Sequence, residues 1–408
     1  MLLTAKHLIT GDGRTVLSNA ALLVVDGRIA DLGLVTELQA RYPNQPLEDL
    51  GEATLLPGLI DMHVHLGYYY SQPDAESYDD YLIACHAMAH GRDALKTGVT
   101  TVRDLSSPPG LMRQLKKAAE KNYAPLPRLF HSGAGICMSG GHGHEDGVEE
   151  ADGPWAVRSA IRRQRRDGAD WIKILTSGRE DIPEYTQEEL DAAADECRRR
   201  NIPSAVHAGL QPAIEMCIQA GFDTIEHGTF LTAAQAAHMK EKGIAWVPTM
   251  VAYTYLYEKT RETSCGHPGN SVSVRAVRDR IFFEKAYLSY KENFKKLYDT
   301  GVTVLAGSDM VLLGAPVTPI PRELDLMVEY GITPVQAVAT ATSEPARVLG
   351  ISDEAGALKK GLAADILAVR GNAAEDIKAL ESVIKVWQNG CVVHREPDGK
   401  QPFNKEEL

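Results

Sequence analysis

Cysteine is scarce and unpaired in this chain. The first residues, MLLTAKHLITGDG, lack the charged region and apolar run of a secretory signal. No stretch reaches the roughly 18 consecutive apolar residues that a membrane helix needs. The absence of any CxxC pair favours reduced thiols over a disulfide framework or a thiolate zinc site. We therefore expect a soluble, cytoplasmic protein that does not bind membranes, with six reduced cysteines: Cys85, Cys137, Cys197, Cys217, Cys265 and Cys391.

Positive charge is also in deficit. Lys and Arg number 43 against 55 Asp and Glu, which gives a formal net charge of -12, whereas proteins that track nucleic-acid phosphates concentrate positive charge. The chain has no GxGxxG after its first predicted strand and no GxxxxGKS or GxxxxGKT, so nothing predicts the phosphate cradle of a nucleotide-binding fold. These absences favour a small-molecule substrate over nucleic acid. With 44% hydrophobic residues over 408 positions, the chain can still bury a large core.

The two ends of the chain share one pattern. Residues 1–56 and 352–408 alternate short apolar runs with turn signals, as in ALLVVDGRIADLG and GLAADILAVRG, which is typical of β-hairpins. Each end holds too few strands for a core of its own. We predict that both ends together form one small β-sandwich domain.

Residues 57–351 alternate short β-branched runs with amphipathic helical stretches. A capping box of Thr186 and Glu189 begins one of these helices, and Thr333 with Pro334 begins another. Eight parallel βαβ units predict an α/β fold, a (β/α)8 TIM barrel; an open doubly wound sheet is the alternative. The eight candidate strands are LIDMHV, VTTVRD, RLFHSG, WIKILT, PSAVHA, DTIEHG, IAWVPT and VTVLAGSD.

Polar side chains stand at the ends of these predicted strands, where the catalytic residues of TIM barrels lie. The first strand ends in His63 and His65, which alternation along a strand points to the same side. Taken one at a time, each of these polar residues is interpreted as a hydrogen-bonded core residue or a surface residue. Together they are a costly concentration of polar groups unless something binds them. The later strands contribute Lys173, His207, His227 and Asp309.

A divalent metal would remove that cost, because imidazole and carboxylate ligands suit zinc, manganese or iron. Lys173 is the exception, since divalent cations repel an ammonium group. Its amine, with a pKa depressed by burial, can react with carbon dioxide to form a carbamate. A carbamate is a bidentate anion able to bridge two metal ions.

These motifs resemble the amidohydrolase superfamily. PGLIDMHVH carries its HxH, WIKIL its strand-four Lys, SAVHAG and TIEHG its two later His, and GSD its strand-eight Asp. The resemblance covers nearly the whole chain and is strongest to the subgroup related to imidazolonepropionase, which includes Xaa-Pro dipeptidases (prolidases) and Xaa-Arg carboxypeptidases. It implies two divalent ions, zinc favoured: the first on His63, His65 and Asp309, the second on His207 and His227, with carboxylated Lys173 as the bridge.

The same resemblance implies two further site residues. CMSGGHGH is similar to a glycine-rich loop whose His contacts the substrate, which assigns His142 rather than His144. VPTMVAY places Tyr253 where the family has a Tyr that donates to the scissile carbonyl or the oxyanion. Imidazolonepropionase looks mononuclear and lacks the bridging Lys, so the chain is assigned to the binuclear, dipeptidase-like branch. Arg179 stands where relatives often have Gly, and it would pair with a substrate carboxylate or with a surface acid.

The implied activity is metal-dependent hydrolysis of an amide bond. The expected substrate is a dipeptide or an N-acyl amino acid cleaved before its C-terminal residue, with Xaa-Pro favoured by family likeness. Asp309 would accept the proton of the nucleophile and deliver it to the departing amine. Hydrolysis of a cyclic amide or another C–N bond is the alternative within enzymes, and a non-catalytic scaffold is the alternative outside them. Relatives commonly form homo-oligomers, which we also expect here.

Two other clusters suggest a metal but are interpreted differently. His86 and His90 stand four residues apart, a spacing that can bind zinc, but the Glu of an HExxH motif is absent. They are expected to be packing or surface residues of an outer helix. The acidic run GHEDGVEEADG at 143–153 lacks the ligand spacing of an EF-hand, and we expect a solvated loop.

Overall fold

The computed structural model describes residues 1–178, 182–264, 274–310 and 318–396. Among these residues, no helix has both the length and the apolar character needed to cross a membrane. The chain divides into two compact units, which are treated separately below. The first comprises Met1–Leu59, Ala94–Thr100 and Pro334–Leu408, and the second comprises Ile60–Asp93 and Thr101–Thr333.

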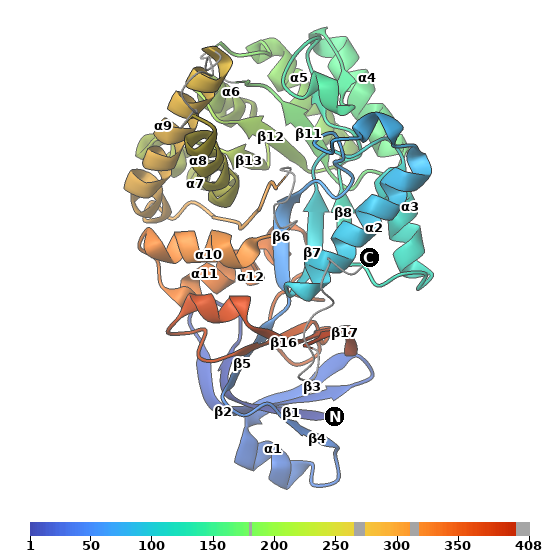
Figure 1. Ribbon diagram of the computed structural model, residues 1–408, viewed down its shortest axis with the longest axis vertical. Helices are drawn as coiled ribbons and strands as arrows, with labels where there is room; N and C mark the ends of the chain where they lie inside the picture. The colour runs from blue at the N-terminus through green and yellow to red at the C-terminus, as the bar shows by residue number, and fades with distance from the viewer. Residues whose placement is uncertain (179–181, 265–273, 311–317, 397–408) are drawn as a thin grey trace. The chain divides into compact units, whose positions relative to one another are not determined.

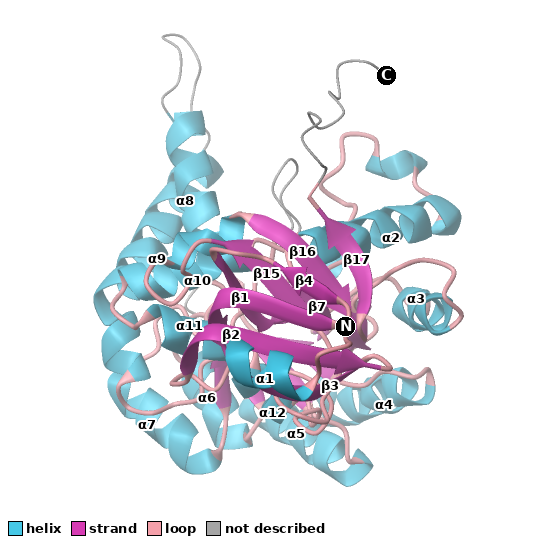
Figure 2. Cartoon of the chain, turned by 90° about the horizontal axis from the view of Figure 1, so that it is seen from below, coloured by secondary structure: helices cyan, strands magenta, loops and turns pink. Residues whose placement is uncertain are grey.

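The first unit contains one sheet built from both ends of the chain (Figure 2). Strand β5 pairs antiparallel with β15, which joins the amino-terminal strands to the carboxy-terminal ones. Hydrogen bonding links all of them into one continuous sheet, because β1 pairs with β4 near its start and with β5 near its end. The packing of these strands as a sandwich stays a prediction. The order is β17-β16-β15-β5-β1-β2-β3, with β4 beside β1. The bounds are β1 Leu2–Ile9, β2 Val16–Val25, β3 Arg28–Leu34, β4 Leu47–Asp49, β5 Ala53–Pro57, β15 Ile366–Arg370, β16 Val383–Gln388 and β17 Cys391–Arg395.

Alternation along the strands gives this sheet two apolar faces. One face carries Leu2, Ala21 and Leu23, which pack against Leu38 of helix α1 (Val35–Arg41). Figure 2 shows α1 lying over β2. Two further helices belong to this unit, α11 (Pro334–Thr340) and α12 (Ser343–Val348), and α11 begins at Pro334 as the sequence predicted. The larger hydrophobic core of this unit includes Leu3, Leu8, Leu22, Leu55, Ile366 and Trp387.

The second unit holds most of the α/β pattern. Neighbouring strands pair in parallel from β7 to β8 and from β11 through β14. Figure 1 shows helices α4 to α8 outside strands β11, β12 and β13. The sequence missed the short strands β9 (Ile136–Cys137) and β10 (Glu149–Glu150). Seven of the eight predicted strands form, with bounds β6 Leu59–Val64, β7 Val99–Asp104, β8 Arg128–His131, β11 Ile172–Leu175, β12 Ser204–Ala208, β13 Thr224–His227 and β14 Ala245–Val247.

The helices follow the strands in the predicted alternation. Helix α5 begins at the predicted capping box: the Thr186 side chain accepts from the Glu189 N–H, and the Glu189 carboxylate accepts from the Thr186 N–H. The helix bounds are α2 Asp80–Lys96, α3 Leu111–Glu120, α4 Gly153–Arg166, α5 Gln187–Arg200, α6 Ala213–Ala220, α7 Ala233–Lys242, α8 Met250–Ser264, α9 Val274–Tyr298 and α10 Ile320–Glu329.

The eighth predicted strand, at 302–309, is not a strand in the structure. It makes a single parallel bridge, from Val304 to Trp246 of β14. Its other backbone hydrogen bonds reach β6: the Met62 N–H donates to the Ala306 carbonyl at 2.9 Å. Because its bonds are divided between two neighbours, no ladder is long enough to count as a strand. The segment nevertheless lies beside both β14 and β6.

A charged network joins helices α4 and α5. The buried Glu196 carboxylate accepts hydrogen bonds from Arg162 at 2.8 and 2.9 Å and from Arg200 at 2.7 Å, and Arg158 lies 3.4 Å away. The hydrogen bonds from Arg162 are the largest influence on the pKa of Glu196, and they outweigh burial to lower it to about 2. The carboxylate is therefore ionised at neutral pH and compensates three guanidinium groups.

We expect Glu196→Gln to lower the free energy of unfolding by about 1–3 kcal/mol at pH 7. The folded-state pKa lies below the ordinary 4.5, so the carboxylate stabilises the fold above that pH and loses this effect as pH falls toward 2. Urea denaturation of variant and parent should show a smaller difference at pH 3 than at pH 7. The exposed Glu188 on the same helix provides the control: Glu188→Gln should cost only a few tenths of a kcal/mol, and equal costs for both would contradict this assignment.

Candidate metal centre

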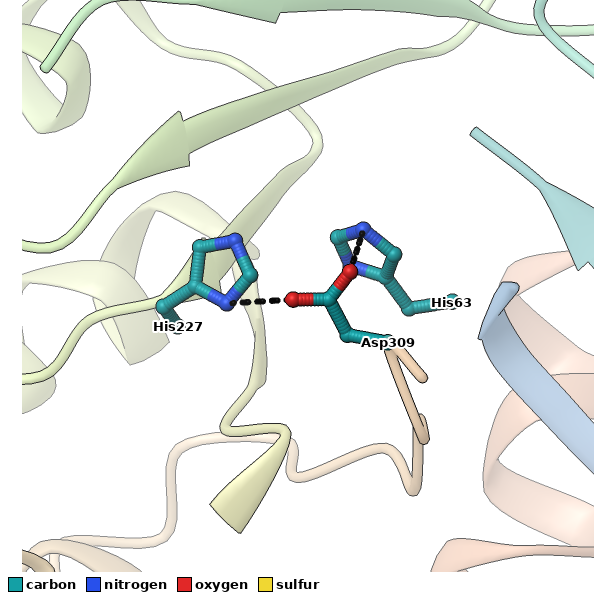
Figure 3. A group of neighbouring side chains, drawn as sticks. All are labelled: His63, His227 and Asp309. Carbon is teal, nitrogen blue, oxygen red and sulfur yellow. Dashed lines mark ion pairs between the residues drawn. The ribbon is translucent and has the colours of Figure 1, made fainter. Parts of the chain in front are cut away.

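Three of the predicted ligands converge from three separate segments. The potential ligand atoms of His63, His227 and Asp309 all lie within 4.8 Å of one another. Asp309 directs one carboxylate oxygen toward each imidazole, with Oδ1 3.4 Å from His63 Nε2 and Oδ2 3.7 Å from His227 Nδ1 (Figure 3). Donors around one tetrahedral zinc ion stand about 3.3 Å apart, given metal–ligand bonds near 2 Å. The spacing of this group therefore suits a cation.

His65 and Lys173 adjoin this group. His65 Nε2 lies 3.0 Å from Asp309 Oδ1, so both histidines of the HxH motif face the same side of β6, as alternation predicts. The Lys173 amine lies 3.4 Å from His63 Nε2. This amine, beside an imidazole nitrogen, is a fifth potential donor of the cluster.

The remaining three predicted residues lie beside His227. The ring of His207 meets that of His227 edge-on, with centroids 4.4 Å apart, and stacks on the ring of His142 at 4.2 Å. Tyr253, in the first turn of α8, has its ring centroid 5.6 Å from that of His227. The backbone N–H of His142 donates to the Glu184 carboxylate at 2.9 Å, which fixes the glycine-rich loop. All eight residues chosen from the sequence line one cavity of about 360 Å³.

Glu226 holds His63 in position and was missed by the sequence analysis. Its buried carboxylate accepts from His63 Nδ1 at 2.8 Å and from the Arg103 guanidinium at 2.9 Å. With its proton on Nδ1, His63 presents the lone pair of Nε2 to the cluster, which is the usual arrangement behind a metal-bound histidine. Glu226 directly precedes His227 in TIEHG, and the residues around it in the sequence do not indicate that it bonds His63 on β6.

Asp61 ties the segment that carries Asp309 to strand β6. Its carboxylate accepts from the backbone N–H groups of His63 at 3.1 Å and Ser308 at 3.0 Å, and from the Ser308 hydroxyl. Burial raises the pKa of Asp61 to about 7. This residue was also missed, because its role depends on a segment almost 250 positions away in the sequence.

The protonation states of the cluster suit a divalent cation. Burial lowers the pKa of His227 to about 4 and that of Lys173 to about 8, so the first is neutral and the second loses its proton readily. Burial raises the pKa of Asp309, but His63 and the hydrogen bond with His65 outweigh it and keep the carboxylate ionised. For His65, burial lowers the pKa and the bond to Asp309 raises it above its ordinary value. Neutral imidazole and ionised carboxylate are the forms that bind metals. His227 and Asp309 are already in these forms, whereas His65 must give up the proton that Asp309 favours when an ion binds, so the residues fit such an ion.

Left-handed backbone conformations recur at this site. His227, Thr249 and Asp309 have φ values of 67°, 51° and 48°, and none of them is glycine. The Thr249 hydroxyl lies 2.7 Å from His227 Nδ1, so two of these residues bond each other. Non-glycine residues in this region store strain that the surrounding structure must hold.

His86 and His90 are packing residues, as predicted. They lie on α2, where His86 Nε2 is 3.1 Å from the Tyr68 carbonyl and His90 Nδ1 is 3.0 Å from the Leu66 carbonyl. Both imidazoles therefore hold the loop that follows β6.

The acidic run at 143–153 is only partly the solvated loop that was predicted: Glu149 and Glu150 form strand β10, Glu149 pairs with Arg163, and Asp146 is turned inward. Glu145 is exposed, as a solvated loop requires, but Asp146 is half-buried and lines the cavity. It ends a short 3-10 helix, η2 (His144–Asp146). Asp146 is half-buried because the turn packs against the loop that follows β6, where Gly147 lies against Tyr70 and Tyr68 bonds the Asp146 carboxylate. Arg179, the candidate partner for a substrate carboxylate, lies outside the described residues.

Comparison with known proteins identifies the family. The Amidohydrolase family model matches residues 54–395. The chain is 30% identical over 431 aligned residues to ochratoxinase of Aspergillus niger, covering 95% of this chain and 85% of that protein. It is 25% identical to imidazolonepropionase of Paraburkholderia phymatum, with 84% of each protein covered. A solved Xaa-Pro dipeptidase with methionine bound in its active site is 31% identical, with a TM-score of 0.83 over 96% of this chain and 98% of that one. The resemblance inferred from the motifs is thus confirmed: the chain belongs to the amidohydrolase family and is a hydrolase of carbon–nitrogen bonds.

Proposed function

We propose that this enzyme hydrolyses the amide bond of a dipeptide or an N-acyl amino acid, releasing the C-terminal residue, with Xaa-Pro dipeptides among its substrates. The observation that carries the proposal is the convergence of imidazoles and a carboxylate beside the buried amine of Lys173, at one cavity. Similarity to a Xaa-Pro dipeptidase over nearly the whole chain supports the choice of a dipeptide.

We also propose that the strands of the second unit close into a (β/α)8 barrel. Two sets of hydrogen bonds support closure. The His131 carbonyl at the end of β8 accepts from the Trp171 N–H at the start of β11, and segment 302–309 bonds both β14 and β6. In a barrel, the C-terminal ends of parallel strands meet at one mouth, which accounts for the convergence of the site residues.

Two divalent ions, with zinc favoured, are proposed for this site. Lys173 is buried and its pKa of about 8 leaves a usable fraction of neutral amine, which carbon dioxide converts into a carbamate. The carbamate replaces an ammonium that would repel the ions with an anion that binds both. The proposed ligands are His63, His65 and Asp309 for one ion, His207 and His227 for the other, and carboxylated Lys173 for both.

The chemistry proposed for the cavity is hydrolytic. Divalent ions held by these residues would supply a hydroxide nucleophile at neutral pH and would polarise the carbonyl group. Asp309, ionised and directed at two imidazoles, takes the proton of the attacking water and passes it to the amine nitrogen as the C–N bond breaks. Tyr253 and His142 line the same cavity and serve as donors to the carbonyl oxygen, on which negative charge develops. The products are a carboxylic acid and a free amine.

A substrate screen tests this function. The purified protein is reconstituted with zinc and assayed for amine release from L-Xaa-L-Xaa dipeptides, N-acyl amino acids and cyclic amides, with the chelated protein as control. We expect dipeptides to be cleaved only by the metal-loaded protein. Cleavage confined to cyclic amides would replace this function with the alternative one. A folded protein that binds no stoichiometric metal would support a scaffold.

Metal binding should depend on Glu226. We expect Glu226→Gln to weaken zinc affinity about 10- to 100-fold, because a neutral amide no longer fixes the Nδ1 proton of His63. Competition with a chelator of known affinity measures this on folded variant and parent. Glu323→Gln is the matched control, since Glu323 is a buried carboxyl that bonds the start of α8 and contacts none of the proposed ligands. Unchanged affinity in Glu226→Gln would contradict the positioning role.

A further inference from the structure

The cavity has both an apolar and an anionic part. Leu256, Phe282 and Phe283 from helices α8 and α9 contribute aromatic and aliphatic surface. Among the described residues that line it, the carboxylates are Asp309 and Asp146. Asp309 is directed at the imidazoles of the metal centre. Asp146 is thus the carboxylate left facing the cavity for another purpose.

Asp146 is held in a fixed turn. Its backbone N–H donates to the Gly143 carbonyl at 2.8 Å, and glycines with positive φ stand on both sides of η2, Gly143 at 80° and Gly147 at 71°. Gly147 packs so closely on Tyr70 that an added Cβ would lie 2.2 Å from the Tyr70 hydroxyl oxygen. The Tyr68 hydroxyl donates to the Asp146 carboxylate. The side chain therefore has a defined position at the cavity.

The charge of Asp146 has only partial compensation within the described chain. Its charge is favoured by His65, His144 and the hydrogen bond from Tyr68 and opposed by Glu145, and no Lys or Arg is among these groups. Arg278 and Lys285, which line an adjoining pocket together with Asp146, are exposed to solvent. Burial raises its pKa, which marks the cost of ionising it there. Removing a carboxylate from water without a paired cation is unfavourable. A cation brought by the substrate would complete the environment.

We infer that Asp146 binds the free α-ammonium group of the substrate's N-terminal residue, so that the enzyme selects dipeptides over N-acyl amino acids. This inference rests on the proposed function and narrows its substrate class. The α-nitrogen is separated from the scissile carbonyl carbon by a single atom, and Asp146 lines the same cavity as His65 and Asp309. A substrate bound with its scissile carbonyl at the metal centre therefore has its ammonium group in the part of the cavity that Asp146 lines. The apolar part, at α8 and α9, then receives hydrophobic side chains.

A pair of substrates that differ only in the amine tests this assignment. L-Ala-L-Phe and N-propionyl-L-Phe have the same carbon skeleton, and only the first carries an ammonium group. The parent enzyme is expected to prefer Ala-Phe in kcat/KM. In Asp146→Asn the ratio of the two kcat/KM values should fall about 10- to 100-fold, the value of one charge-assisted hydrogen bond. Glu145→Gln is the matched control, because Glu145 is the exposed acid beside it and does not line this cavity; its ratio should equal that of the parent.

The possible outcomes distinguish a failure of this inference from a failure of the proposed function on which it rests. A parent enzyme that cleaves both substrates equally well overturns the role of Asp146 and leaves amide hydrolysis standing. Cleavage of neither substrate, nor of any dipeptide, overturns the proposed function itself. A third substrate, L-Ala-L-Lys, tests the other source of positive charge: if Asp146→Asn reduces kcat/KM for Ala-Lys but leaves the Ala-Phe ratio unchanged, Asp146 binds a basic side chain and the inference fails. The parent preference is measurable even if Asp146→Asn does not fold.

Discussion

Asp309→Asn is expected to lower kcat for dipeptide hydrolysis by about 100- to 10,000-fold, the usual value of a positioned acid–base group. The amide is isosteric with the carboxylate but takes no proton from the attacking water. Asn tolerates the left-handed backbone at this position, where φ is 48°, so the fold should be retained. Steady-state kinetics at saturating zinc, with the bound metal measured on the same sample, give the result.

The metal measurement decides between two roles of Asp309. A variant that keeps its metal and loses turnover supports proton transfer, whereas loss of metal in step with activity indicates a ligand alone. Near-normal turnover with the metal in place would contradict both. Asp191→Asn makes the same chemical change at an exposed position on α5, and it should leave kcat unchanged.

Removal of the Lys173 amine should cost both metal and activity. We expect Lys173→Ala and Lys173→Met to bind fewer than two zinc ions per chain. Their activity should fall by more than the roughly 10- to 100-fold that is typical when a residue that supports a metal ligand is lost. The amine lies 3.4 Å from His63 Nε2 in a buried position, so no surface group can take its place. Metal analysis after dialysis, together with kcat/KM, measures the effect.

The same pair of variants tests the carbamate. Lys173→Ala leaves room for a small carboxylate, so propionate in the assay should restore part of its activity. Lys173→Met fills that room and should not respond. Zinc uptake by the metal-free parent should be slower in buffer depleted of carbon dioxide than in bicarbonate. If uptake is indifferent to carbon dioxide and both variants keep two ions, Lys173 is an ordinary buried amine.

The strand-end rule explains how much of the site was accessible from the sequence. Most candidate strands could be recognised by their β-branched and aromatic residues, and five of the eight carry, at or near their ends, a residue chosen as a metal ligand. Parallel strands bring those ends together regardless of the details of packing. His63 and Asp309, 246 positions apart in the chain, could therefore be assigned to one cluster, although only the motif resemblance divided the residues between two ions.

The supporting residues could not be found in this way. Glu226 and Arg103 are charged residues within predicted strands, and nothing local indicates that they pair with each other and with His63. Asp61 is hidden for the same reason, since its partners lie on segment 302–309. That segment has a strand-like composition, but its hydrogen bonds are divided between two neighbours. Three-dimensional pairing, not residue type, decides each of these roles.

The left-handed backbone at His227, Thr249 and Asp309 has a consequence for how this enzyme responds to selection. Such conformations cost of order 1–3 kcal/mol each in non-glycine residues, and glycine adopts them freely. Glycine in place of His227 or Asp309 would relieve the strain and remove a proposed metal ligand in the same step. A population selected for heat resistance alone should therefore accumulate inactive glycine variants here, and only simultaneous selection for turnover would keep the strained residues in place.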